Sequence, residues 1–370
     1  MPNVPSRWVL PKAIGLLLAL SCPVTFGQQA SPKDADDSSE EFHERCPFSA
    51  ERFIVELQQE ESWRRLTAAE CLGEMKDRRA VEPLVQAILK ESFPRLSLYE
   101  IDALKEIGDS HAEDLLLAAL NSKRTRQQAI GALGRLQSKR AVEPIVAILK
   151  HPDRFTTAVA AGALGEIKDP RALLPLCALL TNSDEVIRRY AAQALGYLGE
   201  QSALRSLITA LKDKDDGVRW NAAVSLGELK NREGAEALVG ALNDGEEGVR
   251  VAALDALASI GDSGAVTPIT AVMVSASGRT KWHAASALAV LNTSEAGDAL
   301  TNAMRHGDLT VVAAAYKYFL SKNDPDSVDA LAAAMTEHGW CDMADALANS
   351  GNPRLTDVAR QWQSRTELQQ

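Results

Sequence analysis

Residues 218–229 read VRWNAAVSLGEL, and this stretch decides the fold because its pattern returns along the chain. Positions 218, 222, 226 and 229 are apolar and fall on one face of an α-helix. Asp215 or Asp216 stands just before the pattern, where a helix N-cap is favoured. After a break at 232–234, a second apolar helical pattern runs from Ala235 to Leu242. The stretch predicts a hairpin of two short helices.

The same two patterns recur at a constant spacing. Intervals of 31 residues separate the members of a first-helix series, Leu133, Leu164, Leu195, Leu226, Leu257, Leu288 and Phe319. Leu72, Leu104 and Leu347 extend this series at intervals of 32, 29 and 28 residues. A second-helix series keeps the same 31-residue step through Ile145, Leu176, Leu207, Leu238, Ile269, Leu300 and Leu331, preceded by Leu84 and Leu116. Because one hairpin cannot bury its own apolar face, two series in step predict an all-α solenoid of about ten stacked repeats.

Composition agrees with a folded helical chain. The 370 residues are 46% hydrophobic and only 5% aromatic, with Ala and Leu carrying most of the apolar content. This balance favours packed helices over sheets, which are rich in Val, Ile and aromatic residues. The formal net charge is −10, whereas nucleic-acid binders usually present a basic face. A protein or peptide partner, and no nucleic acid, is therefore expected.

The first 27 residues have the pattern of a secretory signal peptide. Arg7 and Lys12 precede an apolar run over 13–20. Small residues then precede a possible cleavage site after Gly27. The run is shorter than the roughly 20 residues that a membrane span needs. Lipid attachment at Cys22 is an alternative. The expected location is periplasmic, envelope-associated or secreted.

A tether and a solenoid follow the expected signal peptide. Residues 28–45 are acidic and aperiodic, which indicates a flexible tether. The solenoid is expected over 46–370, with a cap over 46–60, repeats over 61–339 and a shortened repeat over 340–370. We expect both ends to have a more polar outer face, and no further segment to cross a membrane. Export would permit a disulfide such as Cys46–Cys71, although nothing in the sequence requires one.

Glycine recurs directly after the first-helix anchors, at Gly73, Gly134, Gly165, Gly196 and Gly227. The helix pattern continues past each of these positions, where Gly costs about 1 kcal/mol relative to Ala. The recurrence predicts that a partner helix approaches closely at this point.

These motifs resemble a known family. The segments Val218-Arg219-x-x-Ala222-Ala223-x-x-Leu226-Gly227 and 161–172 look like short HEAT repeats of the phycobilisome-lyase type, and the resemblance covers roughly residues 46–370. It implies a right-handed α-solenoid with the first helices on the outer face and the second helices on the inner one. The family includes lyases, a hydroxylase and many scaffolds, so the resemblance implies no single function.

Two kinds of enzyme in this family can be compared with the chain. Deoxyhypusine hydroxylase carries paired His-Glu steps on successive helices, whereas this chain has one such step, His43-Glu44, in the expected tether. A phycobilin lyase acts inside the cell, whereas this chain is expected to be exported. We therefore predict no catalytic residues, no metal and no cofactor, and keep a chromophore or cofactor lyase as an alternative function.

A basic residue stands seven positions before most first-helix anchors, at Arg65, Arg126, Arg188, Arg219, Arg250 and Lys281. Asp184, Asp216 and Glu247 lie three or four positions earlier. The row is interpreted as a ladder that bonds successive turns and helix ends. The alternative is a basic track for an anionic ligand.

An acidic row lies two positions before the second-helix anchors, at Glu82, Asp114, Glu143, Glu236, Asp298 and Asp329. Acidic residues near a helix N-terminus complement the helix dipole, at about 0.3–1 kcal/mol each. Alternatively, the row forms an acidic stripe along the inner face that attracts basic partners.

Trp220, Val251 and Trp282 each stand six positions before an anchor, in three consecutive repeats. At 100° per residue this position points away from the buried face, and exposed Trp is enriched in binding hot spots. We expect this row to contact a partner. The alternative is that the rings lie flat over neighbouring repeats.

The sequence as a whole predicts an exported, non-catalytic scaffold that binds a protein or peptide along its surface. No loop insertion interrupts the register between Leu133 and Leu331, so no extra segment is available to build a pocket. An envelope polysaccharide binder, using the Trp row as a sugar platform, is a further alternative.

Overall fold

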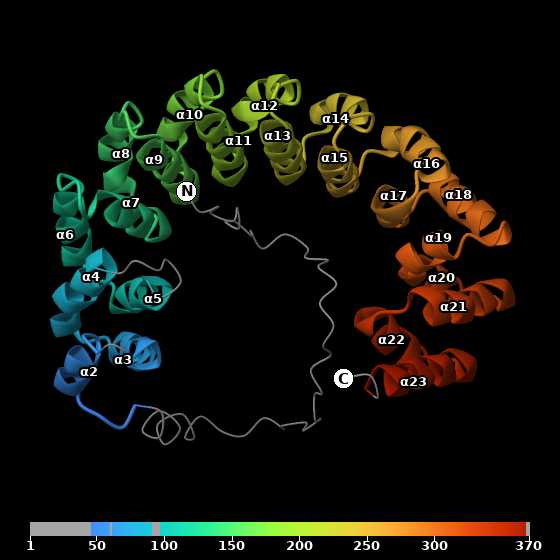
Figure 1. Cartoon of the computed structure of the whole chain (residues 1–370), viewed down its shortest axis with the longest axis horizontal. Coiled ribbons are helices and arrows are strands. Elements are labelled where there is room, and N and C mark those ends of the chain that lie inside the picture. Colours follow the sequence, from blue (N-terminus) through green and yellow to red (C-terminus); the bar gives the residue numbers. More distant parts are fainter. Residues whose placement is uncertain (1–45, 60, 91–96, 368–370) are drawn as a thin grey trace, which may run out of the picture. The chain divides into compact units, whose positions relative to one another are not determined.

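Pairs of antiparallel helices fill the part of the chain that the computed structural model describes, residues 46–59, 61–90 and 97–367. The predicted signal peptide and tether lie outside these residues. Figure 1 shows the helices as two rows, one of first helices and one of second helices. The first helices are α3 (Ser62–Met75), α5 (Ser97–Ile107), α7 (Arg126–Arg135), α9 (Arg154–Ile167), α11 (Glu185–Leu198), α13 (Asp216–Leu229), α15 (Glu247–Ile260) and α17 (Gly278–Leu291).

The second helices are shorter in the middle of the stack. They are α4 (Val81–Lys90), α6 (His111–Ala119), α8 (Val142–Ile148), α10 (Leu173–Leu179), α12 (Leu204–Ala210), α14 (Ala235–Ala241), α16 (Val266–Ser275) and α18 (Ser294–Arg305). Single 3-10 turns precede six of them: η1 (Arg78–Ala80), η2 (Lys139–Ala141), η3 (Pro170–Ala172), η4 (Gln201–Ala203), η5 (Arg232–Gly234) and η6 (Ser263–Ala265).

The two ends of the stack depart from this pattern. A single helix, α2 (Ala50–Glu56), packs on α3 at the N-terminal end. The ninth first helix is broken into α19 (Leu309–Ala314) and α20 (Tyr316–Lys322), followed by α21 (Pro325–His338). The last pair is α22 (Cys341–Ala348) and α23 (Pro353–Glu367). The expected polar outer face is wrong near α2, because Phe48 and Val55 are each 52% exposed.

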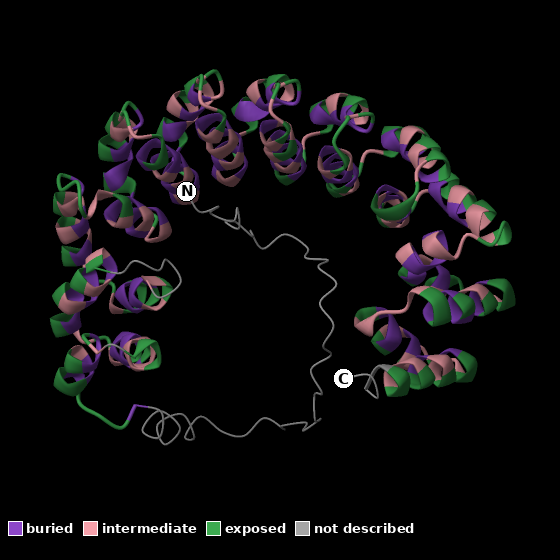
Figure 2. Cartoon of the chain, in the orientation of Figure 1, coloured by how far each residue is buried: buried purple, intermediate pink, exposed green. Residues whose placement is uncertain are grey.

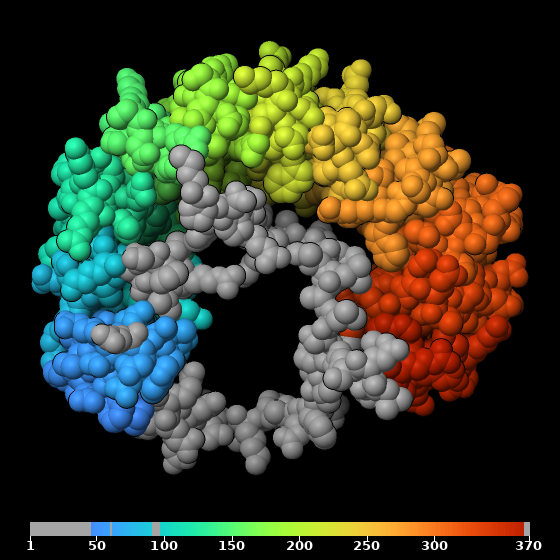
Figure 3. Space-filling view, in the orientation of Figure 1, coloured from blue at the N-terminus to red at the C-terminus, as the bar shows by residue number. Residues whose placement is uncertain are grey.

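The core follows the two series of anchors. Every first-helix and second-helix anchor is buried, and the largest exposed fraction among them is 3%, at Leu104. Figure 2 shows the buried residues on the sides where helices face one another. In the space-filling view, neighbouring colours lie beside one another along the stack (Figure 3), as expected when each repeat packs mainly on the next. The predicted all-α solenoid is confirmed.

Local hydrogen bonds and one left-handed residue fix the ends of α13 and the turn into η5. Asp215 accepts a hydrogen bond from the Val218 N–H and so caps α13, as the sequence predicts. At the other end of α13, Lys230 adopts a left-handed conformation with φ 51°, which ends the helix and turns the chain into η5. Asn231 then accepts from the Glu233 N–H and fixes that turn.

The glycines after the anchors mark the close approach between neighbouring first helices. A Cβ atom on Gly165 would lie 2.7 Å from the Ala194 carbonyl oxygen of α11, and one on Gly227 would lie 2.8 Å from Ala256 Cα of α15. No side chain fits there, which confirms the predicted close approach.

The layer assignment implied by the family resemblance is wrong. First helices pack directly on one another, as α9 on α11 and α11 on α13, whereas second helices such as α10 and α12 pack mainly on the next first helix. The first helices are the more closely spaced layer, and the closely spaced layer of a stack is its inner one. The Gly–Ala contacts above are the physical reason.

Candidate functional site

The basic row forms a ladder between consecutive repeats. Arg219 reaches backward, where its Nη1 donates to the Asp213 carbonyl at 2.9 Å. It also reaches forward, where Nε and Nη2 donate to both carboxylate oxygens of Asp244 at 2.7 and 2.8 Å. Arg188 repeats this geometry with the Asn182 carbonyl and Asp213. The ladder interpretation is confirmed, although the partner acids lie 25 residues onward and are not Asp184, Asp216 or Glu247.

The ladder lowers the pKa values of its aspartates. Hydrogen bonds from the Arg219 guanidinium hold the pKa of Asp244 below its ordinary value. Bonds from Arg188 and from the Asp215 N–H lower the pKa of Asp213 despite the opposing effect of its burial. These acids stay ionised and bonded within the stack, so the ladder is a structural element at Arg188 and Arg219. Among the described residues, Arg250 bonds only the Asp244 and Gly245 carbonyls.

The acidic row on the second helices is exposed, and half of it is already paired. Asp114 accepts from Arg140 at 2.7 Å, Glu143 lies 3.6 Å from Arg171, and Asp329 pairs with Arg354. Each partner belongs to the following repeat. Glu82, Glu236 and Asp298 have no ion pair among the described residues. The row lies on the outer, more widely spaced layer, so the inner stripe expected from the resemblance does not form.

The structure separates the three members of the Trp row. Trp220 is 38% exposed, as expected. Val251 is 3% exposed, so its expected position on the surface is wrong. Trp282 is partly buried, with its ring centroid 5.0 Å from that of Trp340, which in turn contacts Tyr316. The alternative, in which a ring packs on neighbouring repeats, describes Trp282.

Three consecutive first helices carry an exposed stripe, of which the sequence analysis singled out Trp220 alone. The residues share one side of α9, α11 and α13 because they recur every three or four positions. We name this surface the open face; it comprises Phe155, Val159 and Glu166 of α9, Tyr190, Gln193 and Tyr197 of α11, and Trp220, Val224 and Glu228 of α13. Phe155 is 56% exposed, and Val159, Tyr190, Tyr197 and Val224 are partly exposed.

Neighbouring helices of the open face are in contact. A Cβ atom on Gly162 of α9 would lie 3.9 Å from the Tyr190 ring, so this ring lies against the side of α9. The Tyr197 hydroxyl accepts a hydrogen bond from the Gln193 side chain at 3.2 Å, along α11. The open face therefore combines aromatic, aliphatic and polar side chains from three helices that pack on one another.

Two carboxylates border the open face at the C-terminal ends of its helices. Each lies over the glycine that follows the anchor of the preceding repeat. A Cβ atom on Gly134 would lie 3.0 Å from Glu166 Oε2, and one on Gly196 would lie 2.5 Å from Glu228 Oε2. Neither carboxylate forms an ion pair with any other described residue. The glycines thus provide space for helix packing and for these acids at once.

The position of these acids changes their protonation. Burial raises the pKa of Glu166, and the nearby charges of Arg135 and Lys105 only partly oppose this. Burial also raises the pKa of Glu228, whose carboxylate end turns toward α11 although much of the side chain is exposed. Burial raises the pKa of Tyr197 as well, and the charges of Glu228 and Glu166 on either side add to the effect. The three groups therefore form one electrostatic row.

The sequence does contain a signal for the open face, but at a different repeat position from that of the Trp row. The Trp row stands six residues before each anchor, whereas Glu166, Tyr197 and Glu228 stand two residues after it. That later position contains large or acidic residues in three successive repeats. Its exposure becomes visible only once the direction of the neighbouring repeats is known.

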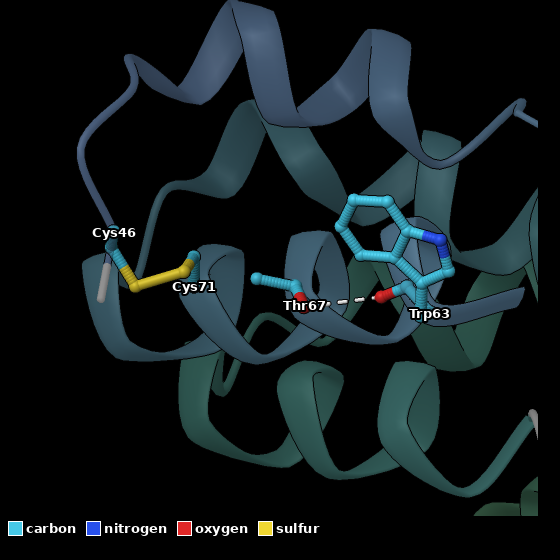
Figure 4. Close-up of a disulfide and its surroundings, with 4 residues drawn as sticks. All are labelled: Cys46, Trp63, Thr67 and Cys71. Carbon is cyan, nitrogen blue, oxygen red and sulfur yellow. Dashed lines mark hydrogen bonds between the residues drawn. A yellow bond between two sulfur atoms is a disulfide. The ribbon is translucent and has the colours of Figure 1, made fainter. Parts of the chain in front are cut away.

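A disulfide fastens the N-terminal end of the stack. Cys46 and Cys71 are bonded, with 5.6 Å between their Cα atoms, and Figure 4 shows the bond joining the segment before α2 to α3. The cysteines are 4% and 2% exposed. On the same helix, Trp63 is 65% exposed, and its carbonyl accepts from the Thr67 hydroxyl at 3.1 Å.

In the described part of the chain, no three His, Cys, Asp or Glu side chains form a group that could hold a metal ion. The His43-Glu44 step lies outside that part. None of the described helices is long and apolar enough to span a membrane.

Solved structures similar to this chain include three of low sequence identity. An engineered protein is 20% identical, with 86% of this chain and 98% of that one covered and a TM-score of 0.43. The complex of CpcE and CpcF of phycocyanin lyase from Nostoc is 21% identical over 76% and 97%, with a TM-score of 0.35. Human deoxyhypusine hydroxylase is 19% identical over 67% and 97%, with a TM-score of 0.30. No curated protein matches the sequence.

Family models match more than half of the chain. HEAT repeats match residues 114–196, 173–258, 218–288 and 235–320, and the PBS lyase HEAT-like repeat matches residues 65–90. These matches coincide with the helix pairs and buried anchors described above. The chain is therefore a member of the HEAT-repeat family, with repeats of the PBS lyase type.

Proposed function

We propose that this chain is an exported, non-catalytic scaffold that binds a protein or peptide partner along the open face. The observation that carries the proposal is the exposure of aromatic side chains on consecutive first helices. Phe155 and Trp220, 56% and 38% exposed, lie on α9 and α13 with Tyr190 between them on α11. Exposed apolar surface of this kind marks interaction sites, and Trp and Tyr dominate binding hot spots.

The regularity of the stack supports the same role. The connections between repeats are short, as from Leu179 to Glu185 and from Ala210 to Asp216. The open face is consequently bordered by other helices and not by long loops. A partner can contact several repeats at once, which is how repeat proteins present extended binding surfaces.

A pull-down tests the binding role. The bait is residues 28–370, used against envelope and secreted extracts of the source organism. The variant Tyr190→Ala with Trp220→Ala removes two rings from the open face. The control is Leu174→Ala with Val274→Ala, because these apolar side chains of α10 and α16 are 78% and 71% exposed on the other layer.

The binding role predicts a protein that the wild type and the control retain and the open-face variant loses. Retention by all three baits would overturn the assignment to the open face. Retention of glycans or a coloured small molecule in place of protein would overturn the scaffold itself.

Export is the second part of the proposal. It is supported by the signal-like pattern of residues 1–27 and by the buried Cys46–Cys71 disulfide, since such bonds persist in oxidising compartments. Cell fractionation with N-terminal sequencing of the purified protein tests it. We expect a chain outside the cytoplasm that begins near residue 28. An intact N-terminus on a cytoplasmic protein with reduced Cys46 and Cys71 would contradict export.

A further inference from the structure

The open face carries an electrostatic imbalance. Two arginines beside the open face are already used: Arg189 donates from Nε and Nη2 to Asp215 at 2.6 and 2.5 Å, and Arg154 lies 3.6 Å from Asp184 and over the Phe155 ring. Arg135 and Lys105 lie near Glu166 and Lys168 lies near Glu228, but none of the three forms an ion pair with these acids. Glu166 and Glu228 have no such partner among the described residues. Two carboxylates of this surface are therefore left without a bonded cation.

The surroundings of the two acids favour a cation. Each carboxylate is partly withdrawn from water against a glycine of the preceding helix, which is costly for an ionised group without a partner. The Tyr197 ring lies on the helix between them, and aromatic rings attract Lys and Arg side chains. A cationic side chain at either acid would gain a charge-assisted hydrogen bond and relieve the unpaired charge.

We propose that the open face binds an extended basic segment of a partner protein, with one cationic side chain at Glu166 and a second at Glu228. This inference rests on the proposed binding function and names the chemistry of the partner. The rings of Tyr190 and Trp220 then contact the stems and the apolar residues of the segment.

The spacing of the two acids sets the spacing of the cations. Glu166 and Glu228 lie on first helices two repeats apart, and packed helices are about 8–10 Å apart, which gives about 16–20 Å. An extended chain advances about 3.4 Å per residue, and its side chains return to the same side every second residue. Two cations about six residues apart therefore match the two acids.

Binding of short peptides to the whole chain tests the proposal. The probe is a fluorescent peptide of Ser, Thr and Gly with two arginines six positions apart, and a second probe has the two arginines adjacent. Glu166→Gln with Glu228→Gln removes both acids while keeping their shape. Glu82→Gln with Glu236→Gln is the matched control, because it removes two unpaired exposed acids from second helices.

We expect the spaced peptide to bind at least tenfold more tightly than the adjacent one, since each charge-assisted bond is worth about a factor of ten. The Glu166/Glu228 variant should lose at least tenfold in affinity for the spaced peptide, whereas the control should change by less than about twofold. The unfolding midpoints of both variants should stay within a few degrees of the wild type.

Three results would overturn the proposal. Equal losses in the two variants would show that general charge alone attracts the peptide. Equal affinity for the two peptides would contradict the spacing. If neither peptide binds while the open face still captures a protein in the pull-down, the basic-segment inference fails and the scaffold function stands.

Discussion

Arg219 and Asp244 form a two-point ion pair between the first helix of a repeat and the turn that ends it, with N–O distances of 2.7 and 2.8 Å. The side chains are 17% and 11% exposed, and Arg219 also bonds the Asp213 carbonyl at the end of the preceding repeat. One residue thus connects the turns that precede and end its repeat. Its equivalents recur through the stack, so the ladder stabilises the register between repeats.

Removing the ladder arginine should be costly. Arg219→Met leaves Asp244 partly buried without its partner, and such changes cost about 3 kcal/mol in the free energy of unfolding. Arg140→Met removes an exposed pair with Asp114, 54% and 55% exposed, and should cost less than about 1 kcal/mol. Urea unfolding of the two variants measures both values. Similar losses would contradict the structural role of the ladder.

The ladder also predicts how stability depends on pH. The pKa values of Asp213, Asp215 and Asp244 are lowered in the folded chain, and hydrogen bonds from Arg171 lower that of Asp169 to about 2. Groups with lowered pKa values contribute stability above their unfolded pKa, near 3.9, and lose it as the pH falls through the folded value. The free energy of unfolding should therefore decrease from about pH 4 downward.

Urea unfolding between pH 6 and pH 2 measures this slope. The double variant Arg188→Met with Asp213→Asn should have a shallower slope, because one lowered pKa is removed. An unchanged slope in that variant would assign the acid sensitivity to other groups.

Two glycine-to-alanine substitutions should change the free energy of unfolding in opposite directions. Gly165→Ala places a methyl group against the Ala194 backbone of the neighbouring helix and should cost about 1–3 kcal/mol. Gly240→Ala, in α14 with open space around it, should stabilise by about 0.5–1 kcal/mol through helix propensity. Thermal unfolding distinguishes them. A neutral Gly165→Ala would contradict the close approach of first helices.

The disulfide should stabilise only its own end of the stack. Replacing Cys46 and Cys71 with Ala opens a loop of 25 residues, for which chain entropy predicts a loss of about 3 kcal/mol. Because repeats interact mainly with their neighbours, faster amide exchange should be confined to α2, α3 and the next pair. Exchange measured by mass spectrometry should be unchanged in α13 and α15. A uniform increase along the chain would show that the stack unfolds as one unit.

Sequence periodicity predicts the features that depend on one repeat and its nearest neighbour. Leu226 and Leu238 are buried as expected, and the glycines meet the neighbouring helix. The layer order was wrong because it was taken from the family resemblance, whereas the Gly–Ala contacts bring the first helices closest together. The spacing of Arg219 indicates a ladder but not its partner, since Asp244 is brought near only by the folding of the whole helix pair.

The surface was harder to predict than the core. Val251 occupies the same repeat position as Trp220, yet the neighbouring repeats bury it. A helical wheel places a side chain relative to its own helix and takes no account of the adjacent repeats. Glu166 and Tyr197 were missed for the same reason, because their importance arises from residues contributed by neighbouring helices.

The central claim is that a partner contacts the open face, and site-specific photo-crosslinking tests it most directly. A photoreactive residue replaces Gln193, in the middle of the open face, and in a parallel chain replaces Leu174 on the second-helix layer. We predict that one protein becomes crosslinked at position 193 and not at 174 in the native envelope or secreted fraction. Crosslinking at 174 alone, or of no protein at 193, would contradict the account.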